Sequence, residues 1–309
     1  MKTTPVTAAD LAASVLAVPP LARHRDLRLN HDANLAMVRY LEDGGVSSHL
    51  YGGNANLYNV SIGEFPELLD MLEEIVAAES WVIPSVGPDF GKMMDQAAIL
   101  KARAFPTVMV LPLAFPATND GVATGIRHFA EAYGMPVIVY IKSDNYLDPA
   151  TVGALASDGI VSAVKYGTVR ANPSDDAYLR TLLDHVDVNL IVSGIGERPA
   201  VAHFREFGLR AFTSGSVCVA PRGSMKMLHA LTDGRWDEAL DVRQAYIPLE
   251  DCRDTFSPIR TLHDAVTFAG IADMGPMLPM LSRLPAAQLD KVREAAITLK
   301  QHDALVAVA

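Results

Sequence analysis

Cysteine, net positive charge and long hydrophobic runs are all scarce in this sequence. Its 309 residues include two cysteines, Cys218 and Cys252, which have neither the spacing of metal ligands nor that of a disulfide framework. Disulfide-rich secreted domains are thereby disfavoured, and a reducing cytoplasm fits the composition best. The formal net charge of -10 argues against nucleic acid and anionic membranes as partners, because both select basic surfaces.

The N-terminal residues also lack the pattern of a secretory signal. Residues 1–21 carry one lysine, an aspartate at position 10 and prolines within the apolar stretch, and no apolar run reaches transmembrane length. We therefore expect a soluble, cytoplasmic protein. What is present is ordinary for a globular chain: 50% of the residues are hydrophobic and 20% are charged, which is enough material for one large core.

Short apolar runs recur at intervals that each fit one strand, one helix and two loops. Several are continuously apolar, as strands buried on both faces are, rather than alternating. The predicted strands span residues 14–18, 47–51, 81–85, 107–111, 136–141, 160–165, 188–193 and 209–213.

Between these runs, and after them, lie segments with helical spacing. Residues 65–78 place Leu68, Leu72 and Ile75 on one face, and residues 89–104 and 121–133 are similar. The end of the chain predicts helices over residues 224–231, 236–246, 257–269 and 286–302. We predict an α/β fold, a (β/α)8 TIM barrel over residues 1–220 that forms the catalytic domain, with C-terminal helices over 221–309 packed on it. A doubly wound open sheet is the alternative, because alternating strands and helices support both.

In a barrel, functional residues lie at the carboxyl ends of the strands. Among the lysines, only Lys142 and Lys165 fall there. Lys165 ends an apolar strand, where burial lowers a lysine pKa and frees the amine for attack on a carbonyl. A lysine that merely reaches out to solvent is the alternative. Lys142 begins a polar loop and is the weaker nucleophile.

Two further strand ends carry candidate groups. Tyr140 ends the fifth predicted strand and can move protons, unless it only covers the core. The second predicted strand runs into Gly52, Gly53 and Asn54, where glycines let backbone N–H groups approach an anion and the asparagine adds donors. A plain turn is the alternative interpretation of the two glycines.

Together these sites resemble the dihydrodipicolinate synthase / N-acetylneuraminate lyase family. That family has a Gly-Thr-Thr-Gly-Glu-like loop after strand two, a tyrosine ending strand five and a Schiff-base lysine ending strand six. The matching stretches here are GGNAN at 52–56, VIVY at 137–140 and AVK at 163–165; SGIGE at 193–197 and FTSGSVCVAP at 212–221 are similar in style. The likeness runs from about residue 13 to residue 284.

The sequence also departs from this pattern. GGNAN lacks both threonines, residues 112–115 lack the tyrosine that the family donates across a subunit interface, and Asn145 stands where true dihydrodipicolinate synthases have an arginine. The segment YIKSDN and the tail IPLEDCRDTFSPIRTLHDAV look closer to the 5-dehydro-4-deoxyglucarate dehydratase-like branch.

The resemblance implies a class I, Schiff-base lyase that acts on a 2-keto acid, by dehydration of a 3-deoxy-2-keto sugar acid or by aldol cleavage. It implies no metal and no cofactor, and a homo-oligomer, dimer or tetramer. A catalytically silent member that binds a keto acid as sensor or scaffold is the alternative, and a metal-dependent barrel enzyme is a third. The implied catalytic residues are Lys165 and Tyr140; the implied substrate-binding residues are Gly52, Gly53, Asn54, Lys142, Ser193, Gly194 and Ser214.

Overall fold

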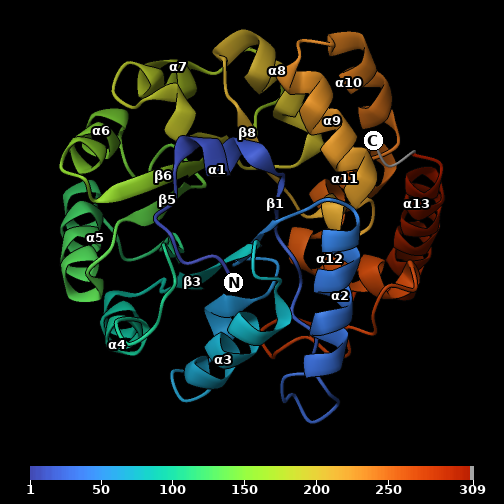
Figure 1. The fold of residues 1–309 in the computed structure, drawn as a ribbon, viewed down its shortest axis with the longest axis horizontal. Coiled ribbons are helices and arrows are strands. Elements are labelled where there is room, and N and C mark those ends of the chain that lie inside the picture. Colours follow the sequence, from blue (N-terminus) through green and yellow to red (C-terminus); the bar gives the residue numbers. More distant parts are fainter. Residues whose placement is uncertain (307–309) are drawn as a thin grey trace.

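Eight parallel strands close into a barrel in this computed structural model, which describes residues 1–306. Each strand pairs with the next, and Leu16 of the first pairs with Thr213 of the last, which completes the ring (Figure 1). The strands are β1 (Leu16–Ala17), β2 (Ser48–Tyr51), β3 (Trp81–Val86), β4 (Met109–Val110), β5 (Val137–Ile141), β6 (Val161–Tyr166), β7 (Ile191–Ser193) and β8 (Ala211–Ser214).

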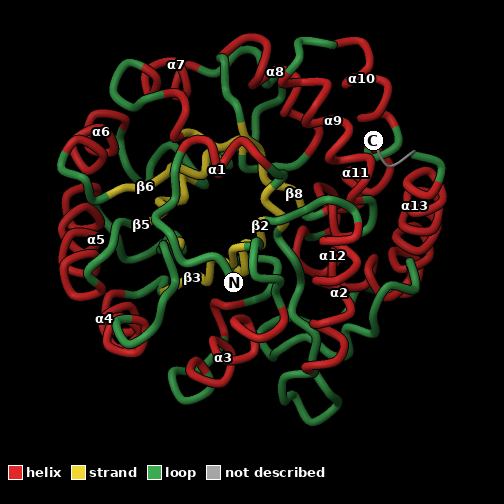
Figure 2. The backbone as a smooth tube through the Cα atoms, viewed as in Figure 1, coloured by secondary structure: helices red, strands yellow, loops and turns green. Residues whose placement is uncertain are grey.

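Helices surround the barrel, one after each strand (Figure 2). They are α2 (His31–Asp43), α3 (Phe65–Ile75), α4 (Phe90–Leu100), α5 (Asn119–Tyr133), α6 (Pro149–Ser157), α7 (Ala177–Leu183), α8 (Glu197–Phe207) and α9 (Pro221–Thr232). Local chemistry sets their ends. In α5, for example, the Thr118 side chain accepts a hydrogen bond from the Gly121 N–H, and Gly134 ends the helix at a φ of 89°.

Four more helices follow the barrel. They are α10 (Trp236–Gln244), α11 (Ile247–Phe256), α12 (Pro258–Phe268) and α13 (Ala286–Ala304). Helices α11, α12 and α13 pack on one another around a buried cluster that includes Tyr246, Leu249 and Leu299. The predicted (β/α)8 TIM barrel with a C-terminal helical extension is confirmed, and the pairing of β1 with β8 excludes an open sheet. The predicted boundary at residue 220 stays a prediction, and residues 307–309 of the predicted C-terminal part lie outside the described residues.

Some predicted elements change in detail. The strand predicted over 188–193 begins as a 3₁₀ turn, η2 (Val188–Leu190), so β7 has only three residues. Two other 3₁₀ turns are η1 (Leu57–Asn59) and η3 (Ser216–Cys218). Helix α11 was not predicted, because Pro248 interrupts its pattern; proline is tolerated there because it lies in the first turn. Helix α1 (Ala8–Ala13) was also not predicted.

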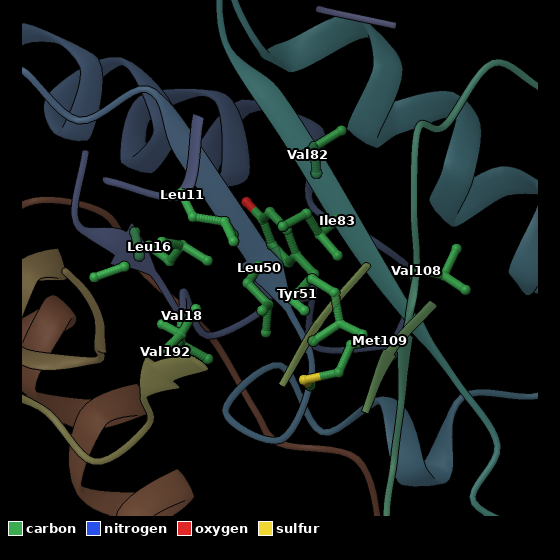
Figure 3. Packing of buried hydrophobic residues seen from close by; sticks show 14 of the residues in the cluster. Leu11, Leu16, Val18, Leu50, Tyr51, Val82, Ile83, Val108, Met109 and Val192 are labelled. Atoms are coloured by element: carbon green, nitrogen blue, oxygen red, sulfur yellow. The ribbon is translucent and has the colours of Figure 1, made fainter. Parts of the chain in front are cut away.

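The core fills the barrel and the space beneath its helices. Leu11 of α1 belongs to the same buried cluster as Leu16, Leu50 and Met109 of the strands (Figure 3). Helix α1 precedes β1 and packs against β8, so it lies at the end where the strands begin. Among residues 1–306, no helix combines the length and the apolar character needed to cross a membrane.

Candidate active site

A cavity of about 350 Å³ lies at the carboxyl ends of the strands. Its walls come from the ends of the strands, from the loops after β1, β2, β5, β6, β7 and β8, and from helices α11 and α12. The polar and charged side chains that line it are Asn54, Tyr58, Tyr140, Lys142, Lys165, Thr213, Arg253, Asp254 and Ser257.

Lys165 and Tyr140 meet inside this cavity. They are paired neighbours in the register of β5 and β6, so their side chains leave the sheet on the same side. The Lys165 Nζ lies 4.4 Å from the centroid of the Tyr140 ring. Lys165 is only 5% exposed. The predicted nucleophile therefore faces the predicted proton carrier.

The surroundings of Lys165 favour its neutral amine. Burial is the main cause that lowers its pKa from 10.5 to about 7, and the positive charges of Lys142 and Arg253 lower it further. A lysine with this pKa is partly neutral at physiological pH, whereas an exposed lysine is almost wholly charged. The amine can attack a carbonyl only in the neutral form.

Tyr140 carries the opposite shift. Burial raises the pKa of its phenol well above the usual value of 10, and nearby Tyr58 raises it further, while Arg253 lowers it. The phenol is therefore protonated at neutral pH. It can donate a proton to a substrate oxygen, but cannot act as a base until it has done so.

Two glycines allow the close packing around this pair. A Cβ at Gly194 would lie 2.6 Å from the Tyr166 carbonyl oxygen and 3.0 Å from Lys165 Cγ. A Cβ at Gly167 would lie 2.7 Å from the Tyr140 ring. A Cβ at either position would be too close to its neighbours, so the loops after β6 and β7 can approach Lys165 and Tyr140 only because they carry no Cβ there.

The predicted carboxylate loop is partly in place. Gly53 and Asn54 line the cavity, and the Asn54 Nδ2 donates a hydrogen bond to the Val18 carbonyl at 3.0 Å, which fixes the amide. Gly52 lies deeper: a Cβ there would approach Ser85 Oγ and Met109 Cε in the barrel interior. Gly52 is not among the residues that line the cavity.

Two predicted serines lie behind the cavity wall. Ser193 is fully buried, with its hydroxyl 2.8 Å from His203 Nδ1. The Ser214 hydroxyl donates to Glu197 Oε2 at 2.8 Å and accepts from the Val217 N–H. Their neighbours Gly194 and Thr213 line the cavity instead. Successive residues of a strand face opposite sides. A prediction that is wrong by one position therefore selects a side chain that points away from the cavity.

Lys142 lines the cavity at its exposed rim. Of the predicted residues, the structure thus brings together Lys165, Tyr140, Gly53, Asn54, Lys142 and Gly194 around one space.

Arg253 is a charged wall residue that the sequence did not single out. It comes from α11 and is 6% exposed. Its Nη1 donates to the Ile195 carbonyl at 2.7 Å, and its Nη2 donates to Asp254 Oδ1 at 2.9 Å. The only signal in the sequence was its place in the tail that resembles the dehydratase-like branch.

A second cavity, of about 360 Å³, lies between α4 and α5. Its lining is mostly apolar, and Tyr146 is its one ionisable residue. It offers neither a nucleophile nor a charged group, so the cavity around Lys165 is the better candidate for chemistry. Within residues 1–306, no three His, Cys, Asp or Glu side chains are grouped so as to hold a metal ion. That the protein works without metal or cofactor stays a prediction.

Comparison with known proteins finds curated relatives and solved structures that are similar to this chain. No family model matches the chain. A 4-hydroxy-tetrahydrodipicolinate synthase of Pseudomonas putida (strain W619) is 26% identical over 278 residues, which cover 86% of this chain and 90% of the relative.

Two solved structures share the fold. Dihydrodipicolinate synthase from Bacillus clausii superposes with a TM-score of 0.84 at 20% identity, covering 95% of this chain and 100% of that one. A catalytic lysine mutant of the sialic acid aldolase of Ruminococcus gnavus gives 0.83 at 12% identity, covering 96% and 99%. The predicted resemblance to the dihydrodipicolinate synthase / N-acetylneuraminate lyase family is confirmed.

Proposed function

We propose that this chain is a class I lyase that forms a Schiff base between Lys165 and a 2-keto acid. The observation that carries the proposal is the buried Lys165 amine, with a pKa of about 7, in a cavity beside the phenol of Tyr140. The similarity to proteins named as a synthase and as an aldolase with a catalytic lysine supports the same chemistry.

The first step forms a covalent bond at C2 of the substrate. The neutral Lys165 amine attacks the carbonyl, and Tyr140 donates a proton to the resulting oxygen. Water then leaves, and an iminium remains on Lys165. Gly53 and Asn54 hold the C1 carboxylate during this step, the former through its backbone and the latter through its amide.

The iminium draws electrons from C3 and so makes two reactions accessible. Loss of a C3 proton gives an enamine that expels the C4 hydroxyl as water, which is dehydration. Alternatively, removal of the C4 hydroxyl proton and cleavage of the C3–C4 bond release C4 as an aldehyde and leave the enamine of pyruvate on Lys165, which is retro-aldol cleavage. Hydrolysis of the product imine returns the free amine of Lys165. Since the iminium serves as the electron sink, no metal is required in this scheme.

Within this scheme we propose dehydration of a 3-deoxy-2-keto sugar acid first and aldol cleavage second. Lys142 lies at the cavity rim, where its ammonium group can hold a distal carboxylate or hydroxyl. Asn145 stands where dihydrodipicolinate synthases carry an arginine, so lysine biosynthesis is not the proposed role. The relation to the 5-dehydro-4-deoxyglucarate dehydratase-like branch remains a proposal on the same grounds.

A catalytically silent homologue is the second candidate, favoured by one observation. The loop at 52–56 lacks the threonines of the family pattern, so the usual proton relay to Tyr140 has no matching hydroxyl there. Such a protein would bind a keto acid as a sensor or scaffold without turning it over.

Trapping with pyruvate and borohydride separates the two candidates. We expect one reduced pyruvate adduct per chain by mass spectrometry, located by peptide mapping on Lys165. Lys165→Arg should abolish the adduct, while Lys142→Arg, which also keeps the charge, should retain it. An unmodified wild-type chain would favour the silent homologue. A panel of keto sugar acids, tested on wild type and Lys165→Ala, then identifies the reaction.

The remaining proposals concern the setting of this activity. We propose a homo-oligomer, dimer or tetramer, in the cytoplasm, with a small 2-keto acid as its partner. Light scattering on the purified protein measures the assembly, and a monomer at working concentration would contradict it.

A further inference from the structure

The segment Gly194, Ile195, Gly196 and Glu197, which we call the β7–α8 turn, connects Lys165 to the C-terminal extension. Its first three residues line the cavity. Gly194 lies so close to the stem of Lys165 that an added Cβ would be 3.0 Å from Lys165 Cγ. The position of this turn therefore sets what the reacting side chain packs against.

Two buried residues of α11 hold the turn from outside the barrel. Glu250 Oε1 accepts a hydrogen bond from the Glu197 N–H at 3.0 Å, and Arg253 Nη1 donates to the Ile195 carbonyl at 2.7 Å. Glu250 and Arg253 are one helical turn apart and so face the same side. On the barrel side, the Gly196 N–H donates to the Thr213 carbonyl at 3.0 Å.

Gly196 shows how tight this contact is. Its φ of 92° is in the left-handed region that favours glycine, and an added Cβ would overlap Glu250 Oε1 and lie 2.7 Å from Arg253 Nη1. The turn and α11 are thus in direct contact, with no room for a side chain between them.

Glu250 is surrounded by charged and titratable groups. Glu197 and Arg198 face it from α8, and Arg253 faces it from its own helix. Burial and the nearby Glu197 raise the pKa of Glu250 to about 8, while the two arginines lower it. A glutamine keeps a side-chain oxygen that can accept the Glu197 N–H, and so is a close mimic of this contact.

We propose that Glu250 is a positioning residue of the Schiff-base site, which acts with Arg253 to hold the β7–α8 turn against Lys165. The C-terminal extension then sets the alignment of the reacting amine without touching it. This inference rests on the proposed function for its effect on chemistry, but its structural part is measurable in the protein without ligand.

Hydrogen exchange of the ligand-free protein tests the structural part. We compare wild type, Glu250→Ala and Glu250→Gln, with Glu294→Ala on the exposed side of α13 as control. In Glu250→Ala, the amides of the β7–α8 turn should exchange about tenfold faster, because one buried hydrogen bond is lost. The amides of β2 to β6 should be unchanged, and Glu250→Gln and the control should match wild type.

Borohydride trapping of pyruvate by the same variants tests the effect on chemistry. The maximal trapping rate of Glu250→Ala should fall about tenfold or more, since small displacements of a reacting group cost rates of this order. The pyruvate concentration for half-maximal trapping should stay the same, because Gly53 and Asn54 hold the carboxylate. Glu250→Gln should restore the rate, which a general loss of stability does not predict.

The outcomes are distinguishable from a failure of the proposed function. If wild type traps no pyruvate, the Schiff-base proposal fails, while the exchange rates still decide whether Glu250 holds the turn. Wild-type exchange at the turn in Glu250→Ala overturns the inference, and so does a full trapping rate despite faster exchange there. If the alanine variant does not fold, Glu250→Asp, which shortens the side chain by one methylene, replaces it with the same expectations.

Discussion

Lys165 is an amine whose charge changes near neutral pH, and its reactivity should follow that change. With a pKa of about 7, the ammonium form dominates below pH 7 and the reactive amine appears as the pH rises through this value. We expect the rate of pyruvate trapping to rise about tenfold per pH unit below pH 6 and to level off above pH 8. The trapping rate is measured in samples quenched at successive times at each pH from 5 to 9. A rate that does not depend on pH would contradict the lowered pKa.

Lys142 should shift that profile. Its positive charge helps to lower the pKa of Lys165, so Lys142→Gln removes one cause of the shift and raises that pKa. The midpoint of the profile should move to higher pH by less than about one unit, because Lys142 is exposed and its charge is screened. Lys101→Gln, at an exposed position, is the matched control. A midpoint that moves to lower pH would show that another charge dominates.

The buried Lys165 should lower the stability of the protein. Its pKa is about 7 in the fold against 10.5 when exposed, so between these values the unfolded chain binds more protons and the free energy of unfolding rises with pH. Lys165→Met should therefore stabilise the protein by roughly 4 kcal/mol at pH 7. This gain should be fully present below pH 7 and should shrink towards pH 10.5. Urea unfolding at pH 7 and pH 10 compares the two proteins, and an equal gain at both would point to packing instead.

At the scale of single residues, the sequence predicted Lys165 and Tyr140, because their position at the ends of strands has a clear chemical reason. A lysine and a tyrosine at strand ends were expected to meet at one end of a barrel, and their side chains do meet. Ser193 and Ser214 were placed one residue off in the alternation, because the ends of such short strands do not fix which face a residue takes. Arg253 was missed, since a helix far along the chain brings it to the cavity and no local pattern reports that contact.

Among the elements, the β7–α8 turn depends on a missing side chain at Gly194. Gly194→Ala would put a Cβ 2.6 Å from the Tyr166 carbonyl oxygen, a backbone atom that cannot move aside. We expect a loss of about 1–3 kcal/mol in the free energy of unfolding and at least a tenfold slower trapping of pyruvate. Gly63→Ala is the control, because its Cβ would have no neighbour closer than 3.9 Å. Trapping at the wild-type rate in Gly194→Ala would mean that the turn adapts freely.

The strands were predictable because their apolar runs are continuous, as burial on both faces demands. Their lengths were not, since the hydrogen-bonded register decides where pairing ends: at 188–190 the chain is apolar enough for a strand but winds into a 3₁₀ turn. Helix α11 was hidden by Pro248, although a proline in the first turn does not break a helix.

For the molecule as a whole, α1 should contribute to stability rather than to chemistry. Leu11 is completely buried in the cluster that fills the barrel, at the end away from Lys165. Leu11→Ala should lower the free energy of unfolding by about 2–4 kcal/mol, the cost of a core cavity. Leu305→Ala, whose side chain is 83% exposed, should cost almost nothing. Denaturant unfolding measures both, and the pyruvate concentration for half-maximal trapping should not change in either.

Barrel closure was predicted from the number of strand–helix units, and the helical extension from the segments left over. What the sequence did not predict is that the extension contacts the β7–α8 turn, which packs against Lys165. That relation depends on contacts between Glu250 and Gly196, more than fifty positions apart, and such contacts leave no periodic signal along the chain.

Because packed side chains fill the barrel below Lys165, the cavity lies at the end where the strands finish. On the proposed mechanism, arriving substrate, departing product and the water that releases it all pass through this end of the barrel. The product formed on Lys165 then leaves through the end of the barrel at which the substrate enters. A compound bound at the rim near Lys142 would therefore block both substrate binding and product release. Turnover at such a site can be no faster than release of the product.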